Sequence, residues 1–157
     1  MSDGPAAVPG APVHGFASWG RRLAALVLDS LLLAVTVVVT ALVAGVPAEQ
    51  LQTEIEAADG MVALLLFVVP KAVYDTLMIG SRNQTLGKMA LKISVVDAGD
   101  GRTRIGYRRA FLRWVVTNLL WSLWLVPGVV DHLWPLRDKR RQAWHDKAVR
   151  SVVVRTA

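Results

Sequence analysis

The chain has 157 residues, of which 54% are hydrophobic and 19% are charged, and its formal net charge is +6. A soluble domain has about 45–50% apolar and about 25% charged residues, so this composition argues against an ordinary soluble protein. The length predicts a single domain. The absence of cysteine excludes a disulfide framework, thiolate chemistry and cysteine-based metal sites.

Residues 1–20 are rich in Gly, Pro and Ala and predict a disordered tail that ends near Trp19. The membrane domain is therefore expected to occupy residues 21–157. The apolar run that follows the tail is longer than the h-region of a signal peptide, which has about 7–15 residues, and it contains an aspartate. These features argue against a signal peptide.

An apolar run over Leu23–Val46 predicts the first membrane-spanning helix. Its length of about 24 residues corresponds to about 36 Å of helix. Pro47 is expected to end the helix, and Asp29 is its only charged residue. A carboxylate inside a membrane costs about 3 kcal/mol or more, so Asp29 needs a partner, a water-filled cavity or a function.

A second span is predicted over Met61–Ile79. Pro70 lies inside it and is expected to kink the helix. Lys71 and Asp75 also lie inside it, and their i,i+4 spacing puts both side chains on one helix face.

Residues 80–113 hold eight Lys or Arg and two Asp, which predicts a segment on the cytoplasmic surface of the membrane. Residues 84–90 are typical of a short amphipathic helix. Residues 92–97 alternate between apolar and polar side chains and, after a turn, 102–105 can return, which predicts a β-hairpin. Two exposed strands alone are marginally stable, and residues 151–155 have the composition of a third strand.

The stretch from Phe111 to Leu136 is apolar and has three tryptophans before Pro127-Gly128 and one after it. A third full span here would place the basic tail outside the cell, against the tendency of Lys and Arg to stay in the cytoplasm. A helix pair that turns near Pro127-Gly128 keeps the tail inside, and arms of about 10–14 residues suit a re-entrant or interfacial segment. The predicted fold is therefore mainly α and integral to the membrane. It has two full transmembrane helices plus a re-entrant or interfacial helix pair, or a third span, with a small cytoplasmic β-hairpin or three-stranded sheet.

The distribution of charge predicts a multi-pass protein of the plasma membrane with a cytoplasmic N-terminus. Arg21 and Arg22 precede the first span, whereas residues 47–60 hold four acids and no base. Basic loops beside apolar spans indicate anionic lipid headgroups as partners rather than nucleic acid, and the same holds for the basic run Arg137–Arg141.

The polar residues inside the two spans are expected at similar depths. Counted from the cytoplasmic ends, Asp29 lies about 9 Å deep, Lys71 about 12 Å and Asp75 about 6 Å. One hypothesis is an ion or proton path between two helices, in which these acids change protonation. The alternative is a polar clasp that holds the helices together. Arg22 is expected about 10 Å from Asp29, where it would meet a lipid phosphate or an acid such as Asp146.

Other motifs carry no chemistry. Gly80–Met89 ends in Gly-Lys like a phosphate-binding loop, but its glycine spacing and Met89 do not fit that motif. His132, His145 and Asp146 match no metal-ligand spacing. We therefore expect no enzyme, no metal site and no cofactor.

Four blocks of residues occur in order along residues 16–155. They are Arg22–Asp29; Gln84–Lys88 with Lys92–Asp97 and Gly101; Phe111–Arg113; and Asp138–Lys147 with Val152–Val154. Together they resemble the RDD family of membrane proteins, named for one arginine and two aspartates. The motif positions are Thr85, Gly87, Lys88 and Arg113. The resemblance implies that the arginine is Arg22 and the first aspartate is Asp29, and that the second is Asp146 or Asp75.

The resemblance also implies a role in transport of an unidentified ligand. A small transporter or ion exchanger would be a homo-oligomer, because two or three helices cannot enclose a path alone. The alternative is a non-catalytic accessory or assembly subunit of a larger membrane complex. The charged residues and the resemblance favour transport, whereas the small number of helices favours the accessory role.

Overall fold

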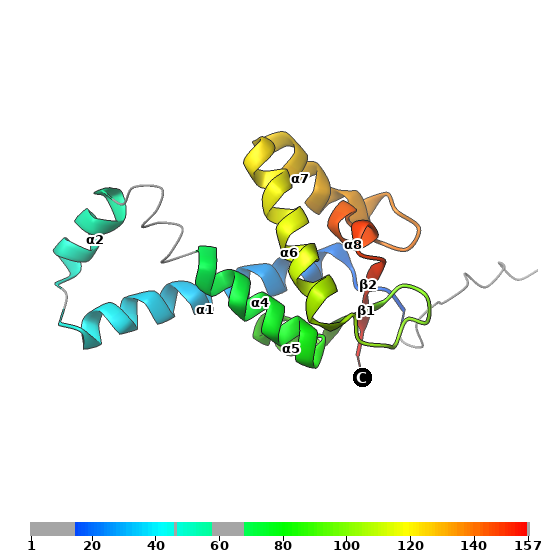
Figure 1. The fold of residues 1–157 in the computed structure, drawn as a ribbon, viewed down its shortest axis with the longest axis horizontal. Coiled ribbons are helices and arrows are strands. Elements are labelled where there is room, and N and C mark those ends of the chain that lie inside the picture. The colour runs from blue at the N-terminus through cyan, green and yellow to red at the C-terminus, as the bar shows by residue number, and fades with distance from the viewer. Residues whose placement is uncertain (1–14, 46, 58–67, 157) are drawn as a thin grey trace, which may run out of the picture.

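A computed structural model describes residues 15–45, 47–57 and 68–156. The described chain is mainly helical, with one small antiparallel sheet (Figure 1). Its elements, in order, are α1 (Trp19–Val43), α2 (Ala48–Ala57), α4 (Val69–Arg82), α5 (Leu86–Ala90), β1 (Ile93–Asp97), α6 (Gly106–Leu123), α7 (Leu125–Leu133), the 3₁₀ turn η2 (Trp134–Leu136), α8 (Trp144–Ala148) and β2 (Ser151–Arg155).

Helix α1 begins and ends earlier than the predicted span Leu23–Val46. It starts at Trp19 because the hydroxyl of Ser18 accepts a hydrogen bond from the N–H of Arg21. It ends before Pro47 because Gly45 adopts a left-handed conformation (φ +74°), which glycine accepts without strain.

Within the described ranges, α1 is the one helix whose length and apolar composition suffice to cross a membrane. Its apolar side chains are largely exposed: Val35 is 58% exposed, Leu42 59% and Val43 84%. The core helix of a soluble protein would bury such side chains. The predicted first span therefore has the surface expected of a lipid-facing helix.

The second predicted span is described only from residue 68, since 61–67 lie outside the described residues. Helix α4 begins at Val69 with Pro70 in its first turn, where the missing N–H costs no intrahelical hydrogen bond. The kink predicted at Pro70 therefore falls at the boundary of the described chain.

The sheet pairs β1 with β2 in antiparallel register, with Val95 opposite Val153. The prediction of a strand at residues 151–155 is thus confirmed, but the return strand at 102–105 is wrong. That segment forms only one bridge, between Val96 and Arg104. The carboxylate of Asp100 accepts hydrogen bonds from the N–H groups of residues 102 and 103 and from the hydroxyl of residue 103. These hydrogen bonds stabilise a turn in place of an extended strand.

The free edge of β2 is covered by residues 15–17 instead. Ala17 donates its N–H to the carbonyl of Val153 at 2.9 Å, and Arg155 donates to the carbonyl of Gly15 at 3.0 Å. The sequence predicts a disordered tail over residues 1–20, yet residues 15–17 pair along the sheet edge, which would otherwise leave backbone groups without partners, and α1 begins at Trp19. Residues 1–14 lie outside the described chain.

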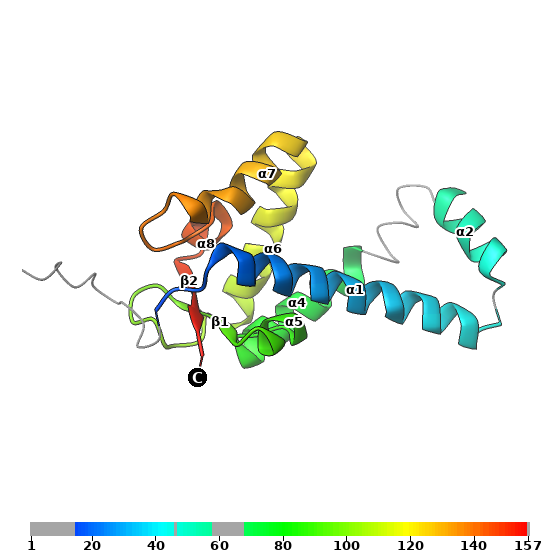
Figure 2. The same cartoon turned by 180° about the vertical axis from the view of Figure 1, so that it is seen from behind.

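The stretch 111–136 contains two successive helices, α6 and α7, but the chain turns between them at a different residue from the one predicted. Trp124 is extended and separates α6 from α7, whereas Pro127 and Gly128 lie within α7. Gly128 is used for close packing: a Cβ atom there would lie 2.4 Å from the ring of Trp121. Figures 1 and 2 show that α6 and α7 lead away from α1 at a steep angle.

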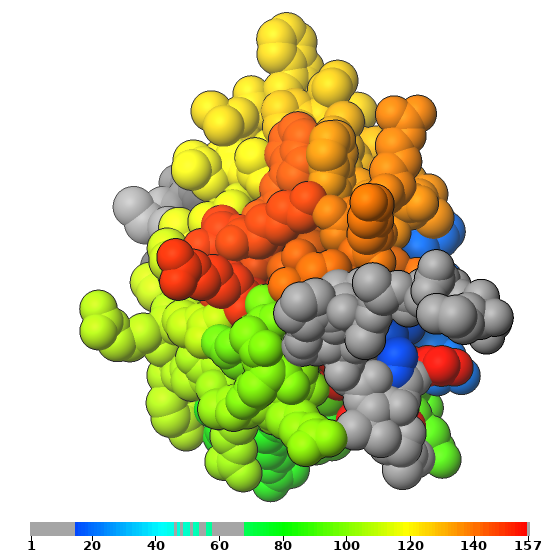
Figure 3. Space-filling model, turned by 90° about the vertical axis from the view of Figure 1, so that its right-hand side faces the viewer, coloured from blue at the N-terminus to red at the C-terminus, as the bar shows by residue number. Residues whose placement is uncertain are grey.

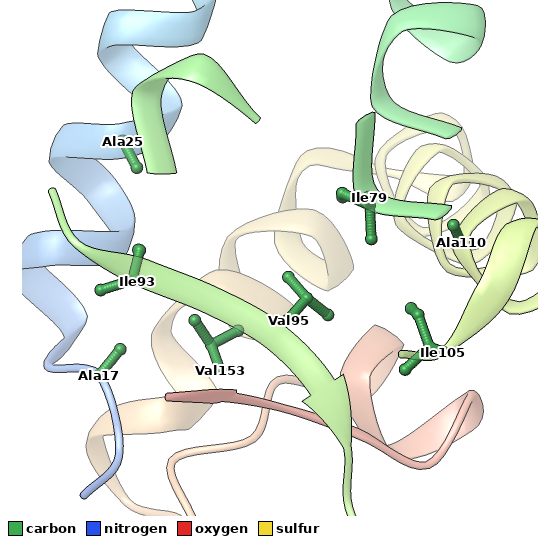
Figure 4. Close-up of a cluster of buried hydrophobic side chains, with 8 residues drawn as sticks. All are labelled: Ala17, Ala25, Ile79, Ile93, Val95, Ile105, Ala110 and Val153. Carbon is green, nitrogen blue, oxygen red and sulfur yellow. The ribbon is translucent and has the colours of Figure 1, made fainter. Parts of the chain in front are cut away.

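The core lies where the sheet meets the first half of α1. Buried side chains on one face of the sheet pack against α1, α4 and α6 (Figure 4); they are Ala17, Ala25, Ile79, Ile93, Val95, Ile105, Ala110 and Val153. A second cluster around Val96 and Val152 covers the other face, with Phe16 packed against it. This core fixes the start of α1 relative to α5, α6 and α8, and so positions the polar side chains described next.

Candidate functional site

Asp29 of α1 is 3% exposed and accepts a hydrogen bond from each of three groups. These are the hydroxyl of Tyr74 at 2.9 Å, the hydroxyl of Thr85 at 2.5 Å and the backbone N–H of Gly87 at 2.8 Å. Because the donors come from α4, from the N-cap of α5 and from α5 itself, one carboxylate joins three helices. Charge-assisted bonds of this kind are stronger than neutral ones.

Gly87 allows α5 to lie directly against α1. A Cβ atom at this position would lie 2.3 Å from the carbonyl oxygen of Ala25 and 2.9 Å from Cγ of Asp29. The hydroxyl of Tyr74 also accepts a hydrogen bond from the N–H of Leu86 at 2.9 Å, so the same tyrosine connects both helices to the aspartate. The contact therefore depends on glycine for reasons of space.

Lys88 supplies the nearest cation to Asp29. Its Nζ lies 4.0 Å from Oδ2 of Asp29 and donates a hydrogen bond to the hydroxyl oxygen of Thr85 at 3.2 Å. Burial lowers the pKa of Lys88 to about 8, and the positive charge of Arg113 contributes to that decrease. Lys88 is thus mainly protonated at neutral pH but loses its charge in the mildly alkaline range.

Asp146 of α8 is completely buried between two arginines. Its Oδ2 lies 2.7 Å from Nη1 of Arg22, and its Oδ1 lies 2.9 Å from Nε of Arg113. Burial alone would raise the pKa of Asp146, but the guanidinium charges of Arg113 and Arg22 hold it well below its ordinary value. Of the two partners considered for Arg22, the structure shows the acid. Arg22, Arg113 and Asp146 thus tie α1, α6 and α8 together, and we call this group the Asp146 clasp.

His145 connects the Asp146 clasp to α7. Its Nδ1 lies 2.5 Å from Oδ2 of Asp131, and its Nε2 lies 2.8 Å from Nη2 of Arg113. Arginine can only donate, so Nε2 is the acceptor and Nδ1 carries the proton. Burial lowers the pKa of His145, and the Arg113 charge lowers it further. The imidazole is therefore neutral and serves as a bridge between a carboxylate and a guanidinium.

Lys71 and Asp75 form an ion pair along one face of α4, as their spacing predicts. The hypothesis of a single cluster with Asp29 is met only in part, because Asp29 takes its hydrogen bonds from other residues. The three side chains nevertheless line one cavity of about 370 Å³ between α1, α4, α5, α6 and α7. Its polar lining consists of Arg22, Asp29, Ser30, Lys71, Asp75, Lys88, Arg113, Thr117, Asn118, His132 and His145.

Sequence reasoning missed Tyr74, Asp131 and the bridging role of His145. Tyr74 lies between Lys71 and Asp75 in the second predicted span, and a hydroxyl in an apolar span is a signal that it needs a polar partner. Asp131 interrupts an apolar stretch and was a similar signal, since a buried carboxylate is paired. Among the described residues, no three His, Cys, Asp or Glu side chains are grouped so that they could hold a metal ion.

The sequence model of the RDD family matches residues 16–150, which is most of the chain. The chain belongs to the RDD family. No curated protein and no solved structure matches it. The matched residues include Asp29 with its hydrogen-bond donors and the Asp146 clasp. Of the two candidates for the second aspartate, Asp146 is the one that contacts Arg22. Together with the exposed apolar surface of α1, RDD membership supports a small membrane protein.

Proposed function

We propose that this RDD protein crosses the plasma membrane twice between its N-terminal segment and β1, with both termini in the cytoplasm. The support comes from the sheet, in which residues 15–17, β1 and β2 are paired with one another and so lie on one side of any membrane. A chain that leaves through α1 must return before β1. Between β1 and β2 the chain turns back at Trp124, which fits an interfacial α6–α7 pair and needs no further crossing.

The charge distribution supports this orientation. The side that carries the sheet holds Arg21 and Arg22 and the basic segments 80–113 and 137–157, whereas residues 47–60, beyond the far end of α1, are acidic. The steep angle between α1 and the α6–α7 pair, visible in Figures 1 and 2, places the pair along the membrane surface if α1 crosses it.

A reporter fusion tests the topology. A phosphatase or fluorescent reporter is expected to report a cytoplasmic location when fused after Ala157 and an external location when inserted near Gln52 of α2. Each fusion is the control for the other: both fusion proteins must be expressed, and their reporters must give opposite locations. A periplasmic or extracellular C-terminus contradicts the proposed topology.

We further propose that the protein takes part in the transport of an ion or small ligand through its polar cavity. The observation that carries this proposal is the cavity of about 370 Å³ beside α1, whose lining includes the Lys71–Asp75 pair and the Asp29–Lys88 pair. Functional pockets have about 300–1,000 Å³ with a few placed polar groups. Ionisable groups at membrane depth mark such pathways or hold helices together.

The contacts support the assignment of these two roles to different residues. Asp29 and Asp146 are saturated with hydrogen bonds or ion pairs across helices, so we assign to them the clasp role. Lys71 and Asp75 hold only each other by ion pairing among the described contacts, and Lys88 changes charge in the mildly alkaline range. Arg22 and Arg113, which also line the cavity, are paired with Asp146. In the two other pairs, Lys71–Asp75 and Asp29–Lys88, the charges balance when Lys88 is protonated, and one negative charge remains when it is neutral. We take this change of charge as support for exchange of a cation against a proton.

The helices in the described part of one chain are too few to enclose a path, so we propose a homo-oligomer as the transporting unit. We propose that the protein is not an enzyme. An accessory subunit of a larger complex is the remaining alternative, and co-purification of stoichiometric partners in mild detergent without flux in liposomes supports it.

Flux through the cavity is tested with Asp75→Asn rather than Asp29→Asn, because Asp29 holds three helices together. Purified protein in liposomes is expected to dissipate a pH gradient when cations are added, and Asp75→Asn is expected to reduce that rate about tenfold or more, an effect of at least ~1.4 kcal/mol on the barrier. The matched control is Glu49→Gln, which removes one exposed acid in α2. Wild-type flux no higher than that of empty liposomes rejects the transport proposal, as does equal loss in both variants.

A further inference from the structure

A second hollow, at the start of α1, is strongly basic. It has about 550 Å³ and is lined by Phe16, Ser18, Arg21, Lys139, Arg141 and Arg155. Of these described lining residues, four are cationic and none is acidic. We call it the basic pocket. Figure 3 shows this end of the molecule, where the blue stretch after residue 15 and the orange segment before residue 142 lie side by side.

The cations of the basic pocket differ from the six Lys and Arg side chains that form ion pairs in the described chain. Arg22, Lys71, Lys88, Arg109, Arg113 and Lys147 each have a carboxylate within 4.0 Å. The side chains of Arg21, Lys139 and Arg141 have no ion pair or hydrogen bond within residues 15–45, 47–57 and 68–156. Three cations held together without an acid repel one another, and this repulsion is relieved by a bound anion.

The loop that carries two of these cations is held in place. The carboxylate of Asp138 accepts hydrogen bonds from the N–H groups of Arg140 and Gln142, both at 3.0 Å. Gln142 in turn donates its side-chain amide to the carbonyl of Ser151 at 2.8 Å. The loop is thus anchored to β2, and a ligand would meet a formed site with little ordering of the backbone.

The position of the pocket identifies its ligand. Arg21 lies in the first turn of α1, just before the exposed apolar surface that begins at Leu23. A hollow at the end of a membrane-crossing helix lies at the level of the lipid phosphates, and cations there are attracted to anionic headgroups. We propose that the basic pocket binds the phosphate headgroup of one anionic phospholipid. This proposal rests on α1 lying in a membrane but not on transport through the cavity.

Native mass spectrometry of the full chain in detergent tests the proposal. The protein is titrated with dioleoylphosphatidylglycerol and, separately, with dioleoylphosphatidylcholine. Wild type is expected to bind one phosphatidylglycerol with at least tenfold preference. The triple variant Arg21→Gln, Lys139→Gln, Arg141→Gln is expected to weaken that binding about a hundredfold, since each cation at a membrane surface contributes about fivefold.

The matched control removes three exposed cations that do not line the pocket: Arg102→Gln, Arg104→Gln, Arg108→Gln. It has the same net charge as the triple variant and is expected to keep the preference. Equal weakening in both variants, or no preference in wild type, overturns the proposal. Displacement of the lipid by inorganic phosphate at equal concentration also overturns it, because the site would then recognise free phosphate. Helical content by circular dichroism verifies that all variants are folded, and absence of flux in liposomes leaves the lipid result unaffected.

Discussion

Gly87→Ala is expected to destabilise the folded protein by about 2.5–6 kcal/mol. The added Cβ would lie 2.3 Å from the carbonyl oxygen of Ala25, which belongs to the backbone of α1 and cannot rotate away. Overpacking alone costs about 1–3 kcal/mol. If α5 moves away from α1 to make room, the hydrogen bond from the backbone N–H of residue 87 to the carboxylate of Asp29 is lost, which costs a further ~1.5–3 kcal/mol because the acceptor is charged. Thermal unfolding of purified protein in detergent measures the effect.

Gly20→Ala is the matched control, since it makes the same change in α1. No atom lies within 4 Å of a Cβ at residue 20 within the described chain. The variant is expected to unfold within about 0.5 kcal/mol of wild type or slightly above it, because alanine favours a helix more than glycine does. If Gly87→Ala and Gly20→Ala unfold at the same temperature, close packing of α5 on α1 is not what holds these helices together.

The parts of the fold that follow from local chemistry could be predicted from the sequence. The apolar run predicts α1, alternation predicts β1 and the valines of residues 151–155 predict β2. Their exact ends depend on single residues such as Ser18 and Gly45, whose capping roles are visible only once the neighbouring backbone is known. The tryptophan-rich stretch predicts the α6–α7 pair, but its turn was placed at Pro127-Gly128 because glycine and proline are the usual signals for a turn. Here Gly128 makes room for Trp121 instead.

The candidate site was harder to predict because its contacts join residues far apart in the chain. The sequence predicts that Asp29 needs a partner, and the estimated depths of the residues in the two spans pair it with Lys71 and Asp75. Depth gives no information about which face of α4 points toward α1, and the group that reaches Asp29 from α4 is Tyr74. Thr85, Gly87 and Lys88 were known as motif positions from the resemblance, yet their shared purpose appears only when α5 is placed on α1.

Asp146→Asn is expected to destabilise the protein by about 3–5 kcal/mol, because it leaves the buried guanidinium groups of Arg22 and Arg113 without a counter-charge. The unfolding temperature in detergent measures the loss. The matched control is Asp97→Asn, which makes the same substitution in another arginine–aspartate pair, with Arg109. Both side chains of that pair are about a third exposed, so its removal is expected to cost about 1 kcal/mol or less.

The Asp146 pair also predicts how stability depends on pH. In the folded protein, the charges of Arg113 and Arg22 outweigh burial and hold the pKa of Asp146 below its ordinary value, so the unfolded chain binds the proton more readily. Stability from this group is therefore fully present above the unfolded pKa of about 3.9 and is lost as the pH falls below it. The difference in stability between wild type and Asp146→Asn is expected to shrink on acidification from neutral pH to below about pH 4. A difference that does not change with pH contradicts the assignment of the lowered pKa to Asp146.

A double-mutant cycle separates the clasp from transport. Arg22→Gln is expected to destabilise wild type by about 2 kcal/mol or more but to have little effect, or to stabilise, in the Asp146→Asn background, where the arginine is already an unpaired buried cation. Additive losses would mean that Arg22 acts through other contacts.

Asp146 does not line the cavity, whereas Asp75 does. The Asp146→Asn variant, assayed below its unfolding temperature, is therefore expected to retain flux per folded molecule, while Asp75→Asn loses flux and remains folded. Loss of flux together with stability in both variants would show that the clasp and the cavity are not independent.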